Sequence, residues 1–157
     1  MEVKLINPFV VAAQTVFKTM LNIELTLGKP SLKEAKTTSG DVTGIMSMVG
    51  DRKGTIAISF REKGALFVFN SLMGDEAPFI GPEVVDAIGE LTNIISGQAR
   101  KEFENSGLNL KASIPMVVVG KGVETNFITK LPIVSLPFDF SAGNGEGEVM
   151  YLDFSFE

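Results

Sequence analysis

The chain has 157 residues, of which 45% are hydrophobic and 21% charged, and its formal net charge is −5. This composition is typical of a globular protein with a sizeable apolar core, and the length suits one domain over residues 1–157. The acidic balance argues against nucleic acid or an anionic membrane as the main partner, because both attract basic patches.

The first helix is predicted from Asn7 and Pro8, which suit a helix cap and a first helical position, to an apolar stripe that ends near Leu21. Its N-terminal segment lacks the basic residues that begin a signal peptide. No apolar run approaches the roughly 18 residues that span a bilayer. These features favour a cytoplasmic location.

The next part of the chain predicts strands and a second, short helix. Glycine and proline interrupt the chain at residues 28–30, and alternating apolar residues then indicate an antiparallel hairpin. The predicted elements are an edge strand or loop over 31–39, strands over 41–49 and 55–60 joined by a turn, and a helix over 62–73 that Gly74 ends.

The second half predicts one long helix followed by strands. Pro82 begins the helix, Glu83 lies in its first turn and Gly107 lies beyond its end at Asn105. Strands are then expected over 110–119, 126–140 and 149–156, with turns at 120–122 and 141–147. Pro132 and Pro137 indicate an edge, a bulge or an irregular region. This order of elements predicts an α+β fold with a mostly antiparallel sheet.

The long helix has two distinct faces. Its apolar stripe comprises Val84, Ile88, Leu91, Ile95 and Ala99. The opposite side carries Asp86, Glu90, Asn93 and Gly97 within an arc of roughly 60°, and Gly89 lies beside this arc. Helix interiors usually avoid glycine. We therefore expect the two glycines to expose backbone around the polar residues and to form a docking surface.

The chain contains no cysteine and no histidine, and this limits the reactions that the surface could catalyse. Disulfides, thiol nucleophiles and thiolate-bound zinc are excluded. Ser-His-Asp hydrolysis and histidine general-base catalysis are excluded as well. Any catalysis must use carboxylates, amides, hydroxyls, lysine or arginine, or groups from a partner.

Each candidate feature also has a plain structural interpretation. Glu90 and Asn93 have the spacing of neighbours on a solvated helix face, and Glu102 and Asn105 repeat that spacing near the helix end. The glycine-rich segment 141–148 lacks a phosphate-binding pattern and is predicted to be a hairpin turn. Alternating phenylalanines predict core or sheet-face packing, with subunit contact left open: Phe138, Phe140, Phe154 and Phe156.

The pattern D-x-x-x-E-x-x-N, formed by Asp86, Glu90 and Asn93 within DAIGELTNIISGQA, resembles the motif of the CheC/CheX/FliY family. These bacterial phosphatases act on the phosphorylated chemotaxis response regulator CheY. The likeness covers the whole chain, 1–157, and a single motif copy resembles CheX most. It implies an α+β fold with a long N-terminal helix, a short helix and a long central motif helix against a mostly antiparallel sheet.

The resemblance implies a phosphatase in which Asn93 positions the attacking water and Glu90 pairs with a receiver lysine. Asp86, Gly89 and Gly97 are expected to contact the receiver. The Mg²⁺ belongs to the phosphorylated receiver, so no cofactor is expected on this chain, and a homodimer formed through sheet edges is expected. Two alternatives stay open: a non-catalytic binding or scaffold protein for a receiver or chemotaxis complex, and an unrelated α+β domain whose polar helix face is merely solvated.

Overall fold

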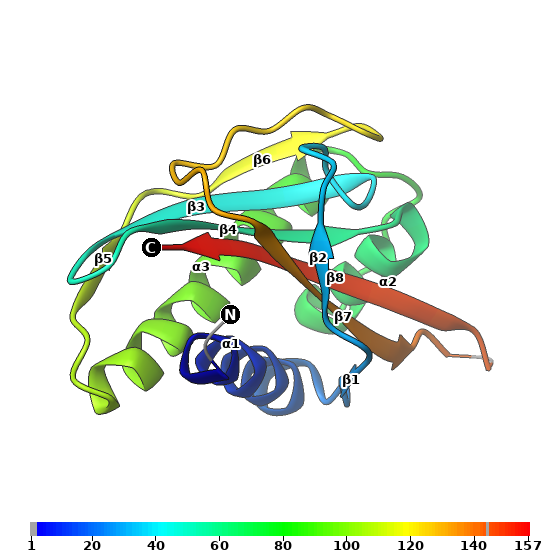
Figure 1. Ribbon diagram of the computed structural model, residues 1–157. Coiled ribbons are helices and arrows are strands. Elements are labelled where there is room, and N and C mark those ends of the chain that lie inside the picture. Colours follow the sequence, from blue (N-terminus) through cyan, green and yellow to red (C-terminus); the bar gives the residue numbers. More distant parts are fainter. Residues whose placement is uncertain (1–2, 144) are drawn as a thin grey trace.

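The computed structural model describes residues 3–143 and 145–157, and it shows an eight-stranded sheet with helices against one face (Figure 1). The neighbouring strands pair antiparallel, which confirms the predicted α+β class. The elements are α1 (Val3–Val16), the π-helical turn η1 (Phe17–Leu21), β1 (Thr26–Leu27), β2 (Ser31–Lys33), β3 (Val42–Gly50), β4 (Gly54–Phe60), α2 (Glu62–Met73), α3 (Pro82–Asn105), β5 (Leu110–Ala112), β6 (Met116–Val119), β7 (Ile133–Ser141) and β8 (Gly147–Phe156).

The strand order is β1-β7-β8-β4-β3-β5, with β2 also paired to β7 and β6 also paired to β3. The predicted hairpin is confirmed as β3 and β4, whose register pairs Val42 with Phe60 and Met48 with Gly54. Helices α2 and α3 have the predicted bounds. Gly74 ends α2 in the left-handed conformation, with φ of 75°, as glycine at this position permits.

The start predicted for the first helix is wrong. The described helix α1 already includes Val3, and Pro8 lies inside it. Leu5 is buried, so the apolar stripe extends further towards the N-terminus than the cap signal at Asn7 suggested. A proline this close to a helix start removes one backbone hydrogen bond but keeps a helical φ. The predicted end is confirmed, because Asn22 follows η1 in a left-handed conformation.

The single strand predicted over 110–119 is wrong, since it is two strands, β5 and β6. Both pair with β3, but Met48 faces Ala112 whereas Ile45 faces Met116. Three residues, 113–115, therefore lie opposite two residues of β3, which is a bulge in the edge of the sheet. Pro115 has no backbone N–H and restricts the residue before it, so the break falls at this proline.

The strand predicted over 126–140 is wrong in its first part, since β7 begins at Ile133, but its two prolines mark interruptions as the sequence predicted. Pro132 directly precedes β7, and Pro137 lies in β7 opposite the gap between β1 and β2, where its carbonyl accepts a hydrogen bond from Gly28 N at 2.7 Å. The predicted turn over 141–147 includes Asn144, which is outside the described residues. On either side of it, Ala142 N donates to Glu146 O at 2.8 Å.

The main core lies between the helices and one face of the sheet. Phe9 of α1 contacts Phe103 of α3 and Phe154 of β8, with ring centroids 5.4 and 4.6 Å apart. Phe67 of α2 stacks on Phe140 of β7. The alternating phenylalanines of β7 and β8 are all buried on this face, which confirms the packing interpretation for Phe138, Phe140, Phe154 and Phe156.

The opposite face of the sheet is covered by chain segments that polar contacts hold in place. Lys33 of β2 forms an ion pair with Asp153 of β8 at 3.0 Å, and Ser135 donates to the same carboxylate at 2.5 Å. Further along, Ile128 N donates to Thr55 Oγ1 at 3.0 Å. Because other segments of the chain cover this face of the sheet, the surface of α3 is the more accessible place for a polar site.

Helix α3 approaches the sheet most closely where Thr92 meets Gly44 of β3. Thr92 is fully buried and its hydroxyl donates to Ile88 O at 2.7 Å within the helix. A Cβ placed on Gly44 would overlap the Thr92 side chain. Glycine is therefore required at this position of β3 so that the helix can lie against the strand.

Replacing Gly44 with alanine is expected to lower the free energy of unfolding by about 2 kcal/mol, because the added methyl group overpacks the contact with Thr92. Chemical denaturation monitored by circular dichroism measures this loss. Gly147→Ala is the matched control, since a Cβ there meets nothing within 4 Å and its φ is not in the left-handed region. Equal stabilities for the two variants would contradict the close-packing role of Gly44.

Candidate functional site

The polar face predicted on the long helix is present in the structure. Asp86, Glu90 and Asn93 are exposed on α3, and Gly97 is half-buried on the same side. The opposite side of the helix is buried against the sheet and the other helices, as the apolar stripe predicted: Val84, Ile88, Leu91, Ile95 and Ala99. The helix thus presents the motif side chains to solvent from a firmly packed base.

Two buried hydroxyl residues of the helix, Thr92 and Ser96, were missed by the sequence analysis, and Thr92 helps to fix the helix. Thr92 directly precedes Asn93, so the contact of Thr92 with Gly44 sets the height of the motif above the sheet. An isolated glycine inside a strand pattern is a sequence signal for close backbone approach. Gly44 within VTGIMS carried that signal.

The expectation that Gly89 exposes its backbone is wrong. Gly89 is buried, and a Cβ built on it would lie 3.2 Å from Val117 Cγ2 of β6. Its lack of a side chain therefore lets β6 pack closely beside α3. Gly97 differs, because a Cβ there would meet only the guanidinium of Arg100, with Nη2 3.7 Å away. Of the two glycines, only Gly97 leaves the polar face open.

The motif side chains are not engaged by the protein itself. Within residues 3–143 and 145–157, the side-chain hydrogen bonds and ion pairs do not involve Asp86, Glu90 or Asn93. An exposed carboxylate can accept hydrogen bonds from a cation, and a carboxamide can both donate and accept. The same part of the chain contains no group of three or more metal-ligating side chains placed to hold a metal ion.

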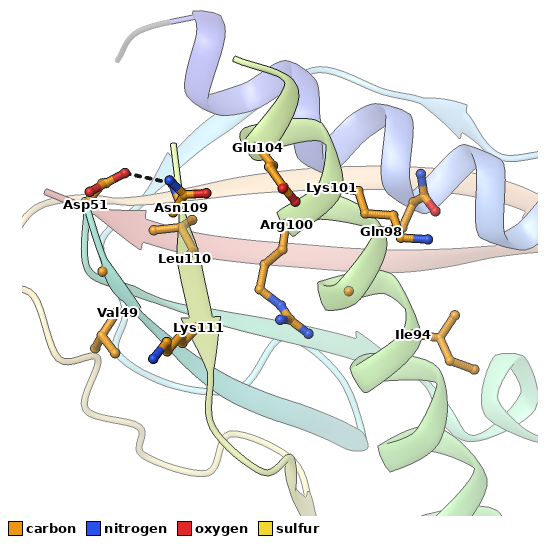
Figure 2. Close-up of a pocket in the computed structure, with 12 residues that line it drawn as sticks. Val49, Asp51, Ile94, Gln98, Arg100, Lys101, Glu104, Asn109, Leu110 and Lys111 are labelled. Carbon is orange, nitrogen blue, oxygen red and sulfur yellow. Dashed lines mark hydrogen bonds between the residues drawn. The ribbon is translucent and has the colours of Figure 1, made fainter. Parts of the chain in front are cut away.

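A groove of about 900 Å³ continues from this face along the C-terminal half of α3. Figure 2 shows its lining residues, with Arg100 extending from α3 and Lys111 on the neighbouring strand β5. Asp51 lies at its far end, where its carboxylate accepts a hydrogen bond from Asn109 N at 2.7 Å. Gly97 belongs both to the motif face and to the lining of the groove, so the two surfaces adjoin each other.

The second Glu-x-x-Asn copy has different surroundings. Glu102 is half-buried and accepts a hydrogen bond from Gln98 Nε2 at 3.3 Å, and Asn105 is the last residue of α3. The carboxylate of this copy is thus already engaged, and its amide lies where helices fray. The first copy has the free side chains and the rigid support that a site requires.

Comparison with known proteins agrees with this geometry. The structure is similar to that of a CheC-like superfamily protein from Shewanella sp. PV-4, with a TM-score of 0.86 and 36% identity over 100% of this chain and 99% of that chain. It also resembles the CheX of the CheX-CheY-BeF3-Mg²⁺ complex from Borrelia burgdorferi, with a TM-score of 0.74 and 25% identity over 99% of both chains.

A sequence relative is the CheY-P phosphatase CheX of Thermotoga maritima, which is 27% identical over 137 residues, or 85% of this chain and 88% of the relative. The family model described as chemotaxis phosphatase CheX matches residues 42–139. The chain therefore belongs to the CheX family. Across the described ranges 3–143 and 145–157, each helix is too short or too polar to cross a membrane.

Gly97→Ala is expected to raise the free energy of unfolding by about 1 kcal/mol, because alanine favours the helix and its methyl group makes only an ordinary contact, 3.7 Å from Arg100 Nη2. Gly89→Ala is expected to gain less or to destabilise the protein, since its methyl group presses on Val117. Denaturant titrations at one fixed protein concentration compare the two variants. Equal stabilisation by both would refute the distinction between a packed and an open glycine.

Proposed function

We propose that this protein hydrolyses the aspartyl phosphate of a CheY-like response regulator. The observation that carries the proposal is the exposed, unengaged pair Glu90 and Asn93 on a helix whose other side is buried. Two relatives support the proposal: the CheY-P phosphatase CheX of Thermotoga maritima and the CheX in the CheX-CheY complex from Borrelia burgdorferi. The partner is accordingly a phosphorylated CheY-like receiver domain.

Asn93 acts by holding the attacking water. Its carboxamide can accept a hydrogen bond from water and donate one to the phosphoryl group, so that the water oxygen lies in line with the bond to be broken. No general base is needed, because positioning and electrostatic stabilisation supply most of the acceleration in phosphoryl transfer. This role suits a chain that has no histidine or cysteine.

Glu90 acts by orienting the docked helix. It lies one turn before Asn93 on the same exposed face, and its carboxylate would pair with a lysine beside the phosphorylated aspartate of the receiver. The water oxygen then forms a bond to phosphorus while the bond between phosphorus and the aspartyl oxygen breaks. Inorganic phosphate and the free receiver carboxylate are the products, and the Mg²⁺ at this centre belongs to the receiver.

The remaining motif positions have supporting roles. Asp86 lies one turn before Glu90 and extends the contact with the receiver. Gly97 keeps the surface beyond Asn93 low, so that the backbone of the receiver can approach the helix. Gly89 supports the site from the buried side of the helix, because its close packing against Val117 fixes the helix beside the edge strand.

Asn93→Ala is expected to reduce the accelerated dephosphorylation by about 100-fold or more, because the attacking water is no longer positioned. Glu90→Ala is expected to weaken receiver binding as well as turnover, and the two effects need not be additive. Phosphate release from a panel of phosphorylated receivers measures both variants and identifies the substrate.

The matched control is Asn105→Ala, which removes the same side chain from the second copy at the end of α3. This variant should keep wild-type activity. Full activity of the Asn93 variant would refute the proposed role of its amide. Equal losses in the Asn93 and Asn105 variants would show that the first copy is not a distinct site.

A non-catalytic binding or scaffold protein is the alternative, since the same exposed face would suit either role. Substoichiometric protein separates the two, because only an enzyme turns over and accelerates the decay of excess phosphorylated receiver. A protein that binds the receiver without this acceleration is a scaffold. A protein that binds no receiver has a helix face that is merely solvated.

We also propose that two copies pair through the β6 edge of the sheet. Strand β6 has the sequence MVVV without charge or proline, and Met116 and Val119 expose 61% and 54% of their surface. Exposed apolar edges are prone to pair with another strand. The opposite edge is less suited, because β1 and β2 are only two and three residues long and flank Lys29 and Pro30.

Lysines at Met116 and Val119 together are expected to convert a dimer into a monomer, because charged side chains on an edge strand oppose its pairing with another strand. Light scattering on a sizing column at micromolar concentration measures the mass. Leu32→Lys is the control, since Leu32 is 65% exposed on β2 at the opposite edge. A monomeric wild-type protein, or a lysine variant that stays dimeric, would contradict this interface.

A further inference from the structure

Arg100 is a cation on the motif face for which the described residues provide no ion-pair partner. The part of the chain covered by residues 3–143 and 145–157 has three ion pairs, none with Arg100. Its Nε atom is buried and has no hydrogen-bond partner within those ranges. The Nη atoms are not among the buried atoms without a partner, so this end of the guanidinium is open to an acceptor from outside the described chain.

The direction of Arg100 follows from helix geometry. Seven residues are nearly two helical turns, so Arg100 projects within about 20° of Asn93 and about 10 Å further along the axis. Helical side chains lean towards the N-terminus. Accordingly, Nη2 of Arg100 lies 3.7 Å from the Cβ position of Gly97, and Figure 2 shows the side chain running along α3 in this direction. Gly97 therefore leaves room for the guanidinium on the side facing Asn93.

The groove around Arg100 does not neutralise it. Lys101 and Lys111 add positive charge, and the carboxylate of Asp51 is engaged by Asn109 N. Glu104 lies one turn beyond Arg100 without forming an ion pair with it. A positively charged position is thus kept beside an otherwise acidic helix face that carries Asp86 and Glu90.

We propose that Arg100 is a docking residue that binds an acidic side chain of the receiver, on the surface bordering the phosphorylated aspartate. The inference rests on the proposed phosphatase function. A receiver site that holds Mg²⁺ supplies carboxylates, and in the proposed contact one acidic side chain of the surrounding surface lies against Arg100. A guanidinium binds a carboxylate through two parallel hydrogen bonds. The guanidinium leans back to the level of Gly97, about 6 Å along the helix from Asn93, which places this contact beside the reacting centre and not within it.

Arg100→Gln is expected to raise the Kd for the receiver about tenfold and to change kcat less than about twofold, because a charged hydrogen-bonded pair is lost away from the reaction. The probe is the receiver that the substrate panel identifies, loaded with beryllofluoride and Mg²⁺. Fluorescence anisotropy measures its binding to the full chain, and phosphate release gives KM and kcat. High salt should narrow the difference between wild type and variant.

Lys101→Gln is the matched control, because it removes the same charge from the next residue, which points about 80° away from Asn93. It should change the Kd less than about twofold. Arg100→Lys keeps the charge and much of the apolar stem but loses the paired geometry, and it should recover part of the affinity. This variant also guards against misfolding of Arg100→Gln, which thermal unfolding monitors.

The outcomes separate the inference from the function on which it rests. Wild-type affinity of Arg100→Gln, or an equal loss in Lys101→Gln, would overturn the docking role while leaving the phosphatase intact. A fall in kcat at unchanged KM would overturn it as well, since Arg100 would then act on the reaction. If the wild-type protein binds no loaded receiver, the proposed function fails and this inference fails with it.

Discussion

The contact between Thr92 of α3 and Gly44 of β3 is the constraint on which the site depends. At this point a side chain of the helix occupies the space that a Cβ of the strand would fill. Both residues lie in the interior of their elements, and Thr92 directly precedes the motif asparagine. The height of Asn93 above the sheet is thus set by a buried contact rather than by a flexible loop, which suits the role in positioning water that we propose for its amide.

This constraint divides α3 into a structural side and a free side. The buried side binds the helix to α1, β3 and β6, and Gly89 belongs to that side because Val117 packs against it. The free side carries three polar residues that the described protein does not bind. A rigid helix with unengaged polar groups supplies geometry to a partner, and its own chemistry can be correspondingly simple.

Sequence patterns predicted the helices and strands well where the signals lie within the element itself. The apolar stripe and the terminal residues of α3 are local signals, and the helix has the predicted bounds. The start of α1 and the break near Pro115 were missed, because competing local signals had to be weighed against burial of Leu5 and pairing with β3. Long-range packing decides such cases.

The candidate site was predicted only in part, because some of its features follow from the local sequence and others from long-range packing. Helical spacing alone placed Asp86, Glu90 and Asn93 on one exposed face, and the structure agrees. Spacing alone also placed Gly89 beside that face, but which side of a helix meets an edge strand depends on the sheet. The contact of Thr92 with Gly44 and the open position of Arg100 also could not be predicted from spacing, since each depends on the tertiary arrangement.

The bulge at residues 113–115 determines which side chain of β6 lies under the motif helix. Side chains alternate along a strand, so a shift of one residue exchanges the two faces. With the extra residue, Val117 pairs with Gly44 and lies on the helix side; without it, Met116 would occupy that place. The short β-branched valine fits the narrow space at Gly89. The bulge therefore fixes which face of β6 meets the helix, and a slip of this pairing by one residue would exchange the two faces.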